Sequence, residues 1–309
     1  MKVFTDVSEI PADFGPSAVT VGKFDGVHEG HRAVINELLG VAERDHLTSA
    51  IVTFDRHPAR LLKPASAPIA LVGNDQKLDL LAATGVDATL MLTFDHDMAW
   101  LSPREFVKQI LVDGLHTRIV LVGADFRFGH KGAGNVDALR EFGAEFGFET
   151  RLIPDVKPTS DRRVSSTWIR ELLAEGDVLH ATALLGHPPA VQGEVVHGAK
   201  RGRELGFPTA NLSPRSEGLI PADGVYAGWL TDGETRYPAA ISVGSNPTFE
   251  GVPPKQVEAY VLDQTIDLYD HVVLISFADR IRGMVKFTGI EPLIEQMNKD
   301  VEQVRERLA

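Results

Sequence analysis

The 309-residue sequence contains no cysteine, which excludes disulfide bonds, cysteine-ligated zinc and thiol catalysis. No apolar run approaches the length of a membrane span, and the N-terminal segment lacks the apolar core of a signal peptide. Positive charge is also scarce, because 31 lysines and arginines stand against 43 acidic residues. This deficit argues against a nucleic-acid backbone or an anionic membrane as the main partner. We expect a cytoplasmic protein with small-molecule partners, present as a monomer or a weak homo-oligomer.

The remaining composition is ordinary for a globular protein, and the chain is long enough for two domains. Up to Gly186, apolar strands alternate with helices, which predicts a parallel sheet covered by helices on both faces. The expected strands are 18–21, 49–54, 86–94, 118–122 and 148–153, and the expected helices include 74–84, 102–111 and 135–146. We therefore predict a first domain over residues 1–186.

Gly186, followed by Pro188 and Pro189, is typical of the end of a helix. Beyond it the alternation of strands and helices ends. The strands expected beyond it, with no helices between them, are 191–196, 225–230, 236–243, 257–262 and 271–277. Such a run predicts an antiparallel sheet or small barrel in a second domain, 187–309. A helix over 291–308 with one apolar face should close it.

The segment 18–32 reads as a strand, a glycine-containing loop and a helix. His28 and His31 lie at the N-terminus of that helix in the order His-x-Gly-His. A helix N-terminus favours phosphate, and each histidine can donate to a phosphate oxygen, while Gly30 permits close approach. A P-loop or a standard dinucleotide fold is not indicated. The alternative is a pair of surface histidines near a turn.

Two further polar loops follow predicted strands, and the carboxyl ends of parallel strands should bring all three loops together. One holds His57; the other, 123–134, holds Asp125, Phe126 and Phe128. The alternatives are a histidine fixed by the following proline in a surface turn, and a glycine-rich turn whose phenylalanines pack inward. One of the two phenylalanines should pack inward in either case.

A later segment, 162–170, contains Ser165, Ser166, Thr167 and Arg170. Its hydroxyls and amides could bind phosphate, with the arginine one turn further supplying positive charge. The alternative is an ordinary helix cap.

In the second half, the string Gly198–Leu212 combines a glycine-bearing cationic loop with a short extended segment. Such a loop could cover a polyphosphate. Thr209 and Asn211 alternate around Ala210, so in a strand they share one side. Their hydroxyl and amide oxygens suit Mg²⁺ that bridges phosphates. The alternative is a strand entry in which both side chains satisfy a turn.

The string Gly22–His31, with the segments 53–58, 123–129 and 165–170, resembles the FAD synthetases among the HxGH nucleotidyltransferases. The string 198–212, with 221–227, 242–249 and 267–269, resembles the riboflavin kinase signature. Departures from the pattern are Arg56, Ala124, Ser242 and Asp270. Together the motifs resemble the bifunctional prokaryotic riboflavin kinase/FAD synthetase family.

The resemblance implies a Rossmann-like α/β domain followed by a β-barrel of the riboflavin kinase type. It implies that ATP and riboflavin give FMN and ADP in the second domain, and that ATP and FMN give FAD and diphosphate in the first, with Mg²⁺. Other possibilities are a flavin- or nucleotide-binding regulator without turnover, and a nucleotidyltransferase for a pantetheine or nicotinate nucleotide ester.

Residue roles follow from the same resemblance. The catalytic residues would be His28, His31, Asn211 and Glu258. ATP or its phosphates would contact Gly22, Phe24, Gly30, His31, Ser165, Ser166, Thr167, Arg170, Gly198, Lys200, Gly202 and Arg203. Flavin would contact His57, Asp125, Phe126, Phe128, Arg280 and Arg282, and the metal would contact Thr209 and Asn211. The alternative for Arg280 and Arg282 is a surface charge pair.

Overall fold

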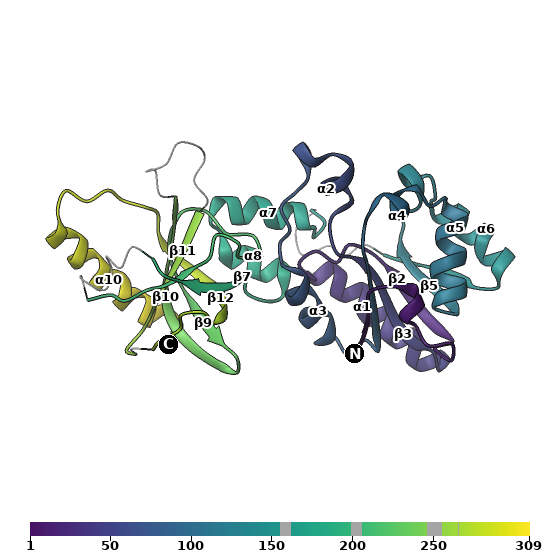
Figure 1. Ribbon diagram of the computed structural model, residues 1–309, viewed down its shortest axis with the longest axis horizontal. Helices are drawn as coiled ribbons and strands as arrows, with labels where there is room; N and C mark the ends of the chain where they lie inside the picture. The colour runs from purple at the N-terminus through teal and green to yellow at the C-terminus, as the bar shows by residue number, and fades with distance from the viewer. Residues whose placement is uncertain (155–161, 199–205, 246–254, 265) are drawn as a thin grey trace. The chain divides into compact units, whose positions relative to one another are not determined.

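Two separately packed units make up the computed structural model, which describes residues 1–154, 162–198, 206–245, 255–264 and 266–309 (Figure 1). The first unit comprises Met1–Ala70 and Asn74–Ser165, and the second comprises Leu71–Gly73 and Ser166–Ala309.

A six-stranded parallel sheet forms the centre of the first unit, in the order β1-β4-β3-β2-β5-β6. Its strands are β1 (Lys2–Phe4), β2 (Ser17–Val21), β3 (Thr48–Phe54), β4 (Ala88–Leu92), β5 (Thr117–Gly123) and β6 (Glu149–Ile153). All five residues of β2 are buried, as expected of a central strand with both faces covered. The predicted parallel sheet is confirmed, and the short edge strand β1 is an addition to it.

Helices cover both faces of this sheet. On one face α1 (Glu29–Asp45) packs Ile35, Leu38 and Val41 against Ile51 and Leu121. On the other lie α5 (Pro103–Phe106), the π-helical turn η3 (Val107–Gly114) and α6 (Val136–Phe146). Shorter elements are α2 (Pro58–Leu62), α3 (Asn74–Ala82), α4 (His96–Trp100) and the 3₁₀ turns η1 (Val7–Glu9), η2 (Pro64–Ser66) and η4 (His130–Gly132).

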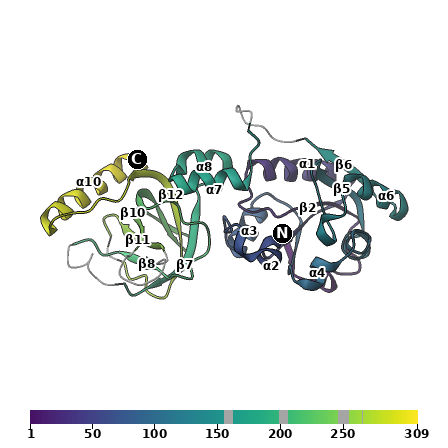
Figure 2. The same ribbon diagram turned by 90° about the horizontal axis from the view of Figure 1, so that it is seen from above.

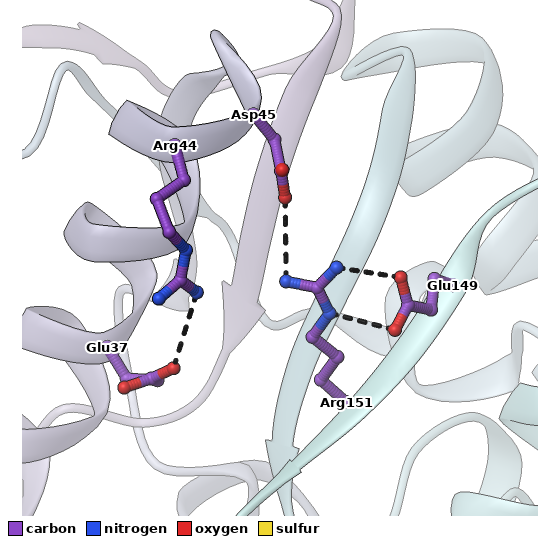
Figure 3. A network of polar contacts seen from close by, with 5 residues as sticks. All are labelled: Glu37, Arg44, Asp45, Glu149 and Arg151. Carbon is purple, nitrogen blue, oxygen red and sulfur yellow. Dashed lines mark hydrogen bonds and ion pairs between the residues drawn. The ribbon is translucent and has the colours of Figure 1, made fainter.

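Charged residues tie the C-terminal end of α1 to the edge strand β6 (Figure 3). Arg151 makes two 2.8 Å hydrogen bonds to Glu149 and reaches Asp45 at 3.5 Å, while Arg44 lies 3.9 Å from Glu37. Since these side chains are largely exposed, the network contributes only modestly to stability. The contact between Arg151 and Asp45 links β6 to the last residue of α1, the helix whose N-terminus carries the histidines.

The second unit is a closed antiparallel barrel in the order β10-β11-β8-β7-β12-β9. Its strands are β7 (Ala190–Val196), β8 (Ala210–Leu212), β9 (Gly224–Asp232), β10 (Thr235–Ser245), β11 (Lys255–Val261) and β12 (Val272–Arg282). A tight turn at Asp232–Gly233 joins β9 to β10. The predicted barrel is therefore confirmed.

In the part of the second unit that the structure describes, three helices pack with the barrel. The terminal helix α10 (Ile290–Leu308) runs along one side of it and buries Val301 and Val304 beside Phe207, as its apolar face predicted (Figure 2). The others are α7 (Ser166–Glu175) and α8 (Val178–Leu185), which ends at Gly186 in the left-handed region. Because α7 and α8 belong with the barrel, the packed units divide after Ser165, earlier in the chain than the change of pattern at Gly186. No helix in the described ranges is long and apolar enough to cross a membrane.

Candidate active sites

The loop between β2 and α1 places His28 as the N-cap of the helix. Its Nδ1 accepts a hydrogen bond from the backbone N–H of His31 at 3.3 Å. Phe24 and Val27 hold positive φ angles of 46° and 41°, which side chains other than glycine adopt rarely. Strain of this kind persists where the surrounding structure fixes the backbone, and it concentrates at functional sites.

The two histidine rings stack on each other. Their centroids lie 3.6 Å apart with an angle of 14° between the planes, and Phe24 lies 5.1 Å from His31 on a tilted plane. A Cβ at Gly30 would come within 3.1 Å of the His28 ring. The glycine of the His-x-Gly-His motif therefore leaves room for the stack as well as for a ligand.

Burial is the main cause that lowers the pKa of His31 well below 6.5, and His28, Lys23 and Arg163 lower it further. The Nδ1 atom of His31 is buried and has no hydrogen-bond partner among the described residues. The His31 ring is therefore neutral at pH 7 and keeps one nitrogen available.

His57, in the loop that follows β3, lies beside the loop between β2 and α1. Its Nδ1 accepts from the N–H of Ala59 at 3.1 Å and caps α2, while its Nε2 lies 3.1 Å from the Lys23 amine. Thr53 also donates to the Lys23 carbonyl at 3.1 Å. The expected convergence of these two loops is therefore observed, and His57 in addition caps α2, which begins at the following proline.

The loop after β5 divides its aromatic residues between two environments. Phe128 is only 6% exposed and lies in the core, where a Cβ at Gly134 would come within 2.7 Å of its ring. Phe126 is half-buried and lies 5.4 Å from Phe128. Asp125 is exposed and pairs with Arg163 at 2.9 Å. As expected, one phenylalanine packs inward, and Phe126 keeps the more accessible ring.

Of the segment 165–170, which was predicted to bind phosphate, Ser165 ends the first unit, whereas Ser166, Thr167 and Arg170 lie on α7 in the second. Their role in binding ATP stays a prediction.

A second polar cluster forms where β8 pairs with β11. Asn211 faces Glu258 across the strand pair. Thr209 donates to Glu258 Oε2 at 3.3 Å, and the Asn211 amide donates to the Thr209 hydroxyl at 3.3 Å. A Cβ at Gly198 would lie 2.6 Å from the Asn211 amide. The sequence placed Thr209 and Asn211 on one side of an extended segment, and the structure adds Glu258 to the same group.

A cavity of about 480 Å³ opens beside Thr209. It is lined by Val195, Pro208, Thr209, Ala210, Ala259, Val261, Gln264, Ile266, Leu268 and Tyr269. A mostly apolar lining next to a hydroxyl and a carboxylate suits a flat organic molecule with one polar end. Sequence analysis missed most of these residues, because apolar strand residues give the same signal whether they line a cavity or a core.

Arg280 and Arg282 have protein partners. Arg280 donates to the carbonyls of Glu175 and Asp223 at 2.9 and 2.7 Å. Arg282 makes hydrogen bonds of 2.6 to 3.1 Å to Asp300 on α10. These contacts join elements of the second unit, and the flavin contact implied by the resemblance stays a prediction. They also differ from the surface charge pair considered as the alternative.

Lys200, Gly202 and Arg203 lie outside the described residues, as does the segment 246–249. Within the described part of the chain, no group of three or more histidine, cysteine, aspartate or glutamate residues could hold a metal ion. The hydroxyl, amide and carboxylate oxygens of Thr209, Asn211 and Glu258 are nevertheless the donors that Mg²⁺ accepts when it keeps several of its waters.

In comparisons with known proteins, each half of the chain matches a different enzyme family. The FAD synthetase family model matches residues 10–168, and the riboflavin kinase model matches residues 185–308. A bifunctional riboflavin kinase/FMN adenylyltransferase of Listeria monocytogenes is 36% identical over 304 residues, 98% of this chain and 93% of the relative. One from Escherichia coli K12 is 36% identical over 291 residues, 93% of this chain and 91% of the relative.

A crystal structure of a Streptococcus pneumoniae protein described as a macrolide-efflux protein has a TM-score of 0.88 and 31% identity, covering 98% of both chains. Its similarity extends over both units.

Proposed function

Since this chain belongs to the family of bifunctional riboflavin kinase/FMN adenylyltransferases, we propose which of its residues carry each of the two reactions. The C-terminal part is the riboflavin kinase, which forms FMN and ADP from riboflavin and ATP. The N-terminal part is the FMN adenylyltransferase, which forms FAD and diphosphate from FMN and a second ATP. We assign residues 1–186 to adenylyl transfer and 187–309 to the kinase, supported by family matches that end at 168 and begin at 185.

For adenylyl transfer, the FMN phosphate is already an anionic nucleophile. An FMN oxygen forms a bond to the α-phosphorus of ATP, the bond from that phosphorus to the bridging oxygen breaks, and diphosphate leaves with the electron pair. No protein nucleophile is needed, so catalysis depends on alignment and on stabilising negative charge. The stacked His28 and His31 rings and the N-terminus of α1 are the donors that we place against the phosphates.

For phosphoryl transfer, the 5′-hydroxyl of riboflavin attacks the γ-phosphorus of ATP and ADP leaves. We propose that Glu258 orients this hydroxyl and accepts its proton, held in place by the hydrogen bond from Thr209. Thr209 and Asn211 would hold Mg²⁺, which supplies positive charge to the phosphates. The apolar cavity beside Thr209 is where we place the flavin ring.

The remaining assignments rest on the family motifs. We propose that Gly22, Phe24 and Gly30 adjoin ATP, as do Ser165, Ser166, Thr167 and Arg170. Gly198, Lys200, Gly202 and Arg203 would cover the ATP phosphates of the kinase site. His57, Asp125 and Phe126 would adjoin FMN. A cytoplasmic location, a monomer or weak homo-oligomer, and the absence of nucleic-acid and membrane partners stay predictions.

The observation that carries the kinase assignment is the contact of Glu258 with Thr209, which itself lines the cavity. Incubating the protein with riboflavin, ATP and Mg²⁺ and separating the flavins by chromatography tests both activities. We expect FMN to appear first and FAD to follow. A protein that binds flavin but leaves riboflavin unchanged would contradict the proposal.

A further inference from the structure

Lys77 on α3 is a lysine buried inside the first unit. Only 6% of the residue is exposed, and its amine donates a 2.6 Å hydrogen bond to the carbonyl of Phe54, the last residue of β3. Lysine is almost never buried to this extent unless its charge is paired. No sequence motif drew attention to this residue, since an isolated lysine in a helix usually faces solvent.

Two carboxylates from two different loops act on this amine. Burial lowers the pKa of Lys77, and the charges of Asp25 and Asp55 oppose that effect. Asp25 belongs to the loop after β2, which positions the His28–His31 stack. Asp55 begins the loop after β3, which continues to His57.

Asp55 is itself fixed within its loop. Its carboxylate accepts hydrogen bonds from the Arg56 side chain and from the N–H of Phe94. Burial alone would raise the pKa of Asp55, but these hydrogen bonds and the nearby charges of Arg56 and Lys77 lower it overall. The negative charges of Asp25 and Asp55 therefore both act on the Lys77 ammonium, and both loops continue to histidines of the proposed adenylyl-transfer site.

We propose that Lys77 is a positioning residue of that site: its buried ammonium holds the loop after β2 and the loop after β3 together by balancing Asp25 and Asp55 and capping the end of β3. This inference rests on the proposed function of the histidine pair. Without the ammonium, the two carboxylates would lose the positive charge that acts on both, and the Phe54 carbonyl would lose the donor that Lys77 supplies. The loops would then separate and displace the histidines.

The first test is Lys77→Met in the full chain, with the exposed Lys2→Met as matched control. We expect kcat for FAD formation from FMN and ATP to fall about 10²-fold, the scale of a displacement of about 1 Å, with little change in KM. Riboflavin kinase activity, measured on the same sample, should stay at the wild-type level. A kcat unchanged from wild type, or a rise in KM alone, would overturn the inference.

The second test separates charge from packing. Because the chain has no cysteine, Lys77→Cys offers a single thiol that can be alkylated in the unfolded chain before refolding. Alkylation with 2-bromoethylamine restores an ammonium at the length of lysine, and 1-bromopropane gives a neutral side chain of the same shape. Because Lys77 lies in the first unit, refolding of each product is checked by comparing its denaturant unfolding curve with that of the wild type.

We expect the aminoethyl form to recover FAD formation and the propyl form to remain impaired. Equal FAD formation by the two forms would show that shape alone suffices and would overturn the inference. Failure of the proposed function is distinguishable, because the wild-type protein would then also make no FAD.

Discussion

At the scale of single residues, the histidine stack makes a prediction about pH. His31 is neutral in the folded protein because burial lowers its pKa, whereas in the unfolded chain it titrates near 6.5. Below about pH 6.5 the unfolded chain gains a proton that the folded protein does not, so stability is lost as the pH falls. We expect His31→Asn to lose less stability than wild type when denaturant unfolding is measured at decreasing pH.

The matched control is His46→Asn, because His46 is exposed and Asn tolerates its left-handed backbone conformation at the end of α1. That variant should follow the wild-type pH dependence. Equal losses of stability in wild type and His31→Asn would contradict a neutral, buried His31.

Residue identities were easier to predict than residue roles. The motifs pointed to His28, His31, Thr209 and Asn211, because their spacing along one strand or one helix start already places them together. The contacts of Arg280 join groups 105 residues apart, and no local pattern reports a partner at such a distance. Lys77 was missed for the same reason, since its burial depends on two loops contributed by other strands.

At the scale of elements, two glycines of α1 make opposite predictions. A Cβ at Gly40 meets nothing within 4 Å, whereas one at Gly30 comes within 3.1 Å of the His28 ring. Gly40→Ala should raise the free energy of unfolding by about 0.5–1 kcal/mol and leave both activities unchanged. Gly30→Ala should disturb the stack and slow FAD formation, measured by flavin chromatography, while FMN formation stays normal. Unimpaired FAD formation by Gly30→Ala would mean that the stack is not needed.

The attachment of α10 to the barrel depends on the ion pair between Arg282 and Asp300, whose carboxylate is buried. Arg282→Met leaves that charge unpaired and should lower the free energy of unfolding by about 3–5 kcal/mol. The double variant Arg282→Met/Asp300→Leu should recover most of the loss, as measured by denaturant unfolding. A rise in KM for riboflavin with unchanged stability would instead support the flavin contact implied by the family motifs.

Most helices and strands could be predicted, because an element with one buried face has apolar residues at regular intervals along its sequence. The observed elements differ from the predicted ones where a segment is too short to show a regular apolar pattern, or has none. The three residues of β1 are too few to show alternation, and the helix opened by the capping box at Ser102 continues as the π-helical turn η3. The placement of α7 with the barrel depends on contacts such as Ala222 N–H to the Leu173 carbonyl, 2.8 Å, which the local sequence does not encode.

At the scale of the whole molecule, each unit buries its own apolar core and carries its own polar cluster. Substitutions at distant, independent sites are usually additive. Disabling one cluster should therefore leave the rate at the other unchanged, although the kinase supplies FMN to the adenylyltransferase.

The most direct test of the account compares His31→Ala with Asn211→Ala, each given riboflavin, ATP and Mg²⁺, and separately FMN, ATP and Mg²⁺. His31→Ala should accumulate FMN at the wild-type rate and form FAD about 10²–10³-fold more slowly, as is typical for loss of one charge-stabilising donor. Asn211→Ala should form little FMN from riboflavin, yet convert supplied FMN to FAD normally. Equal loss of both activities in both variants would contradict the assignment of one reaction to each cluster.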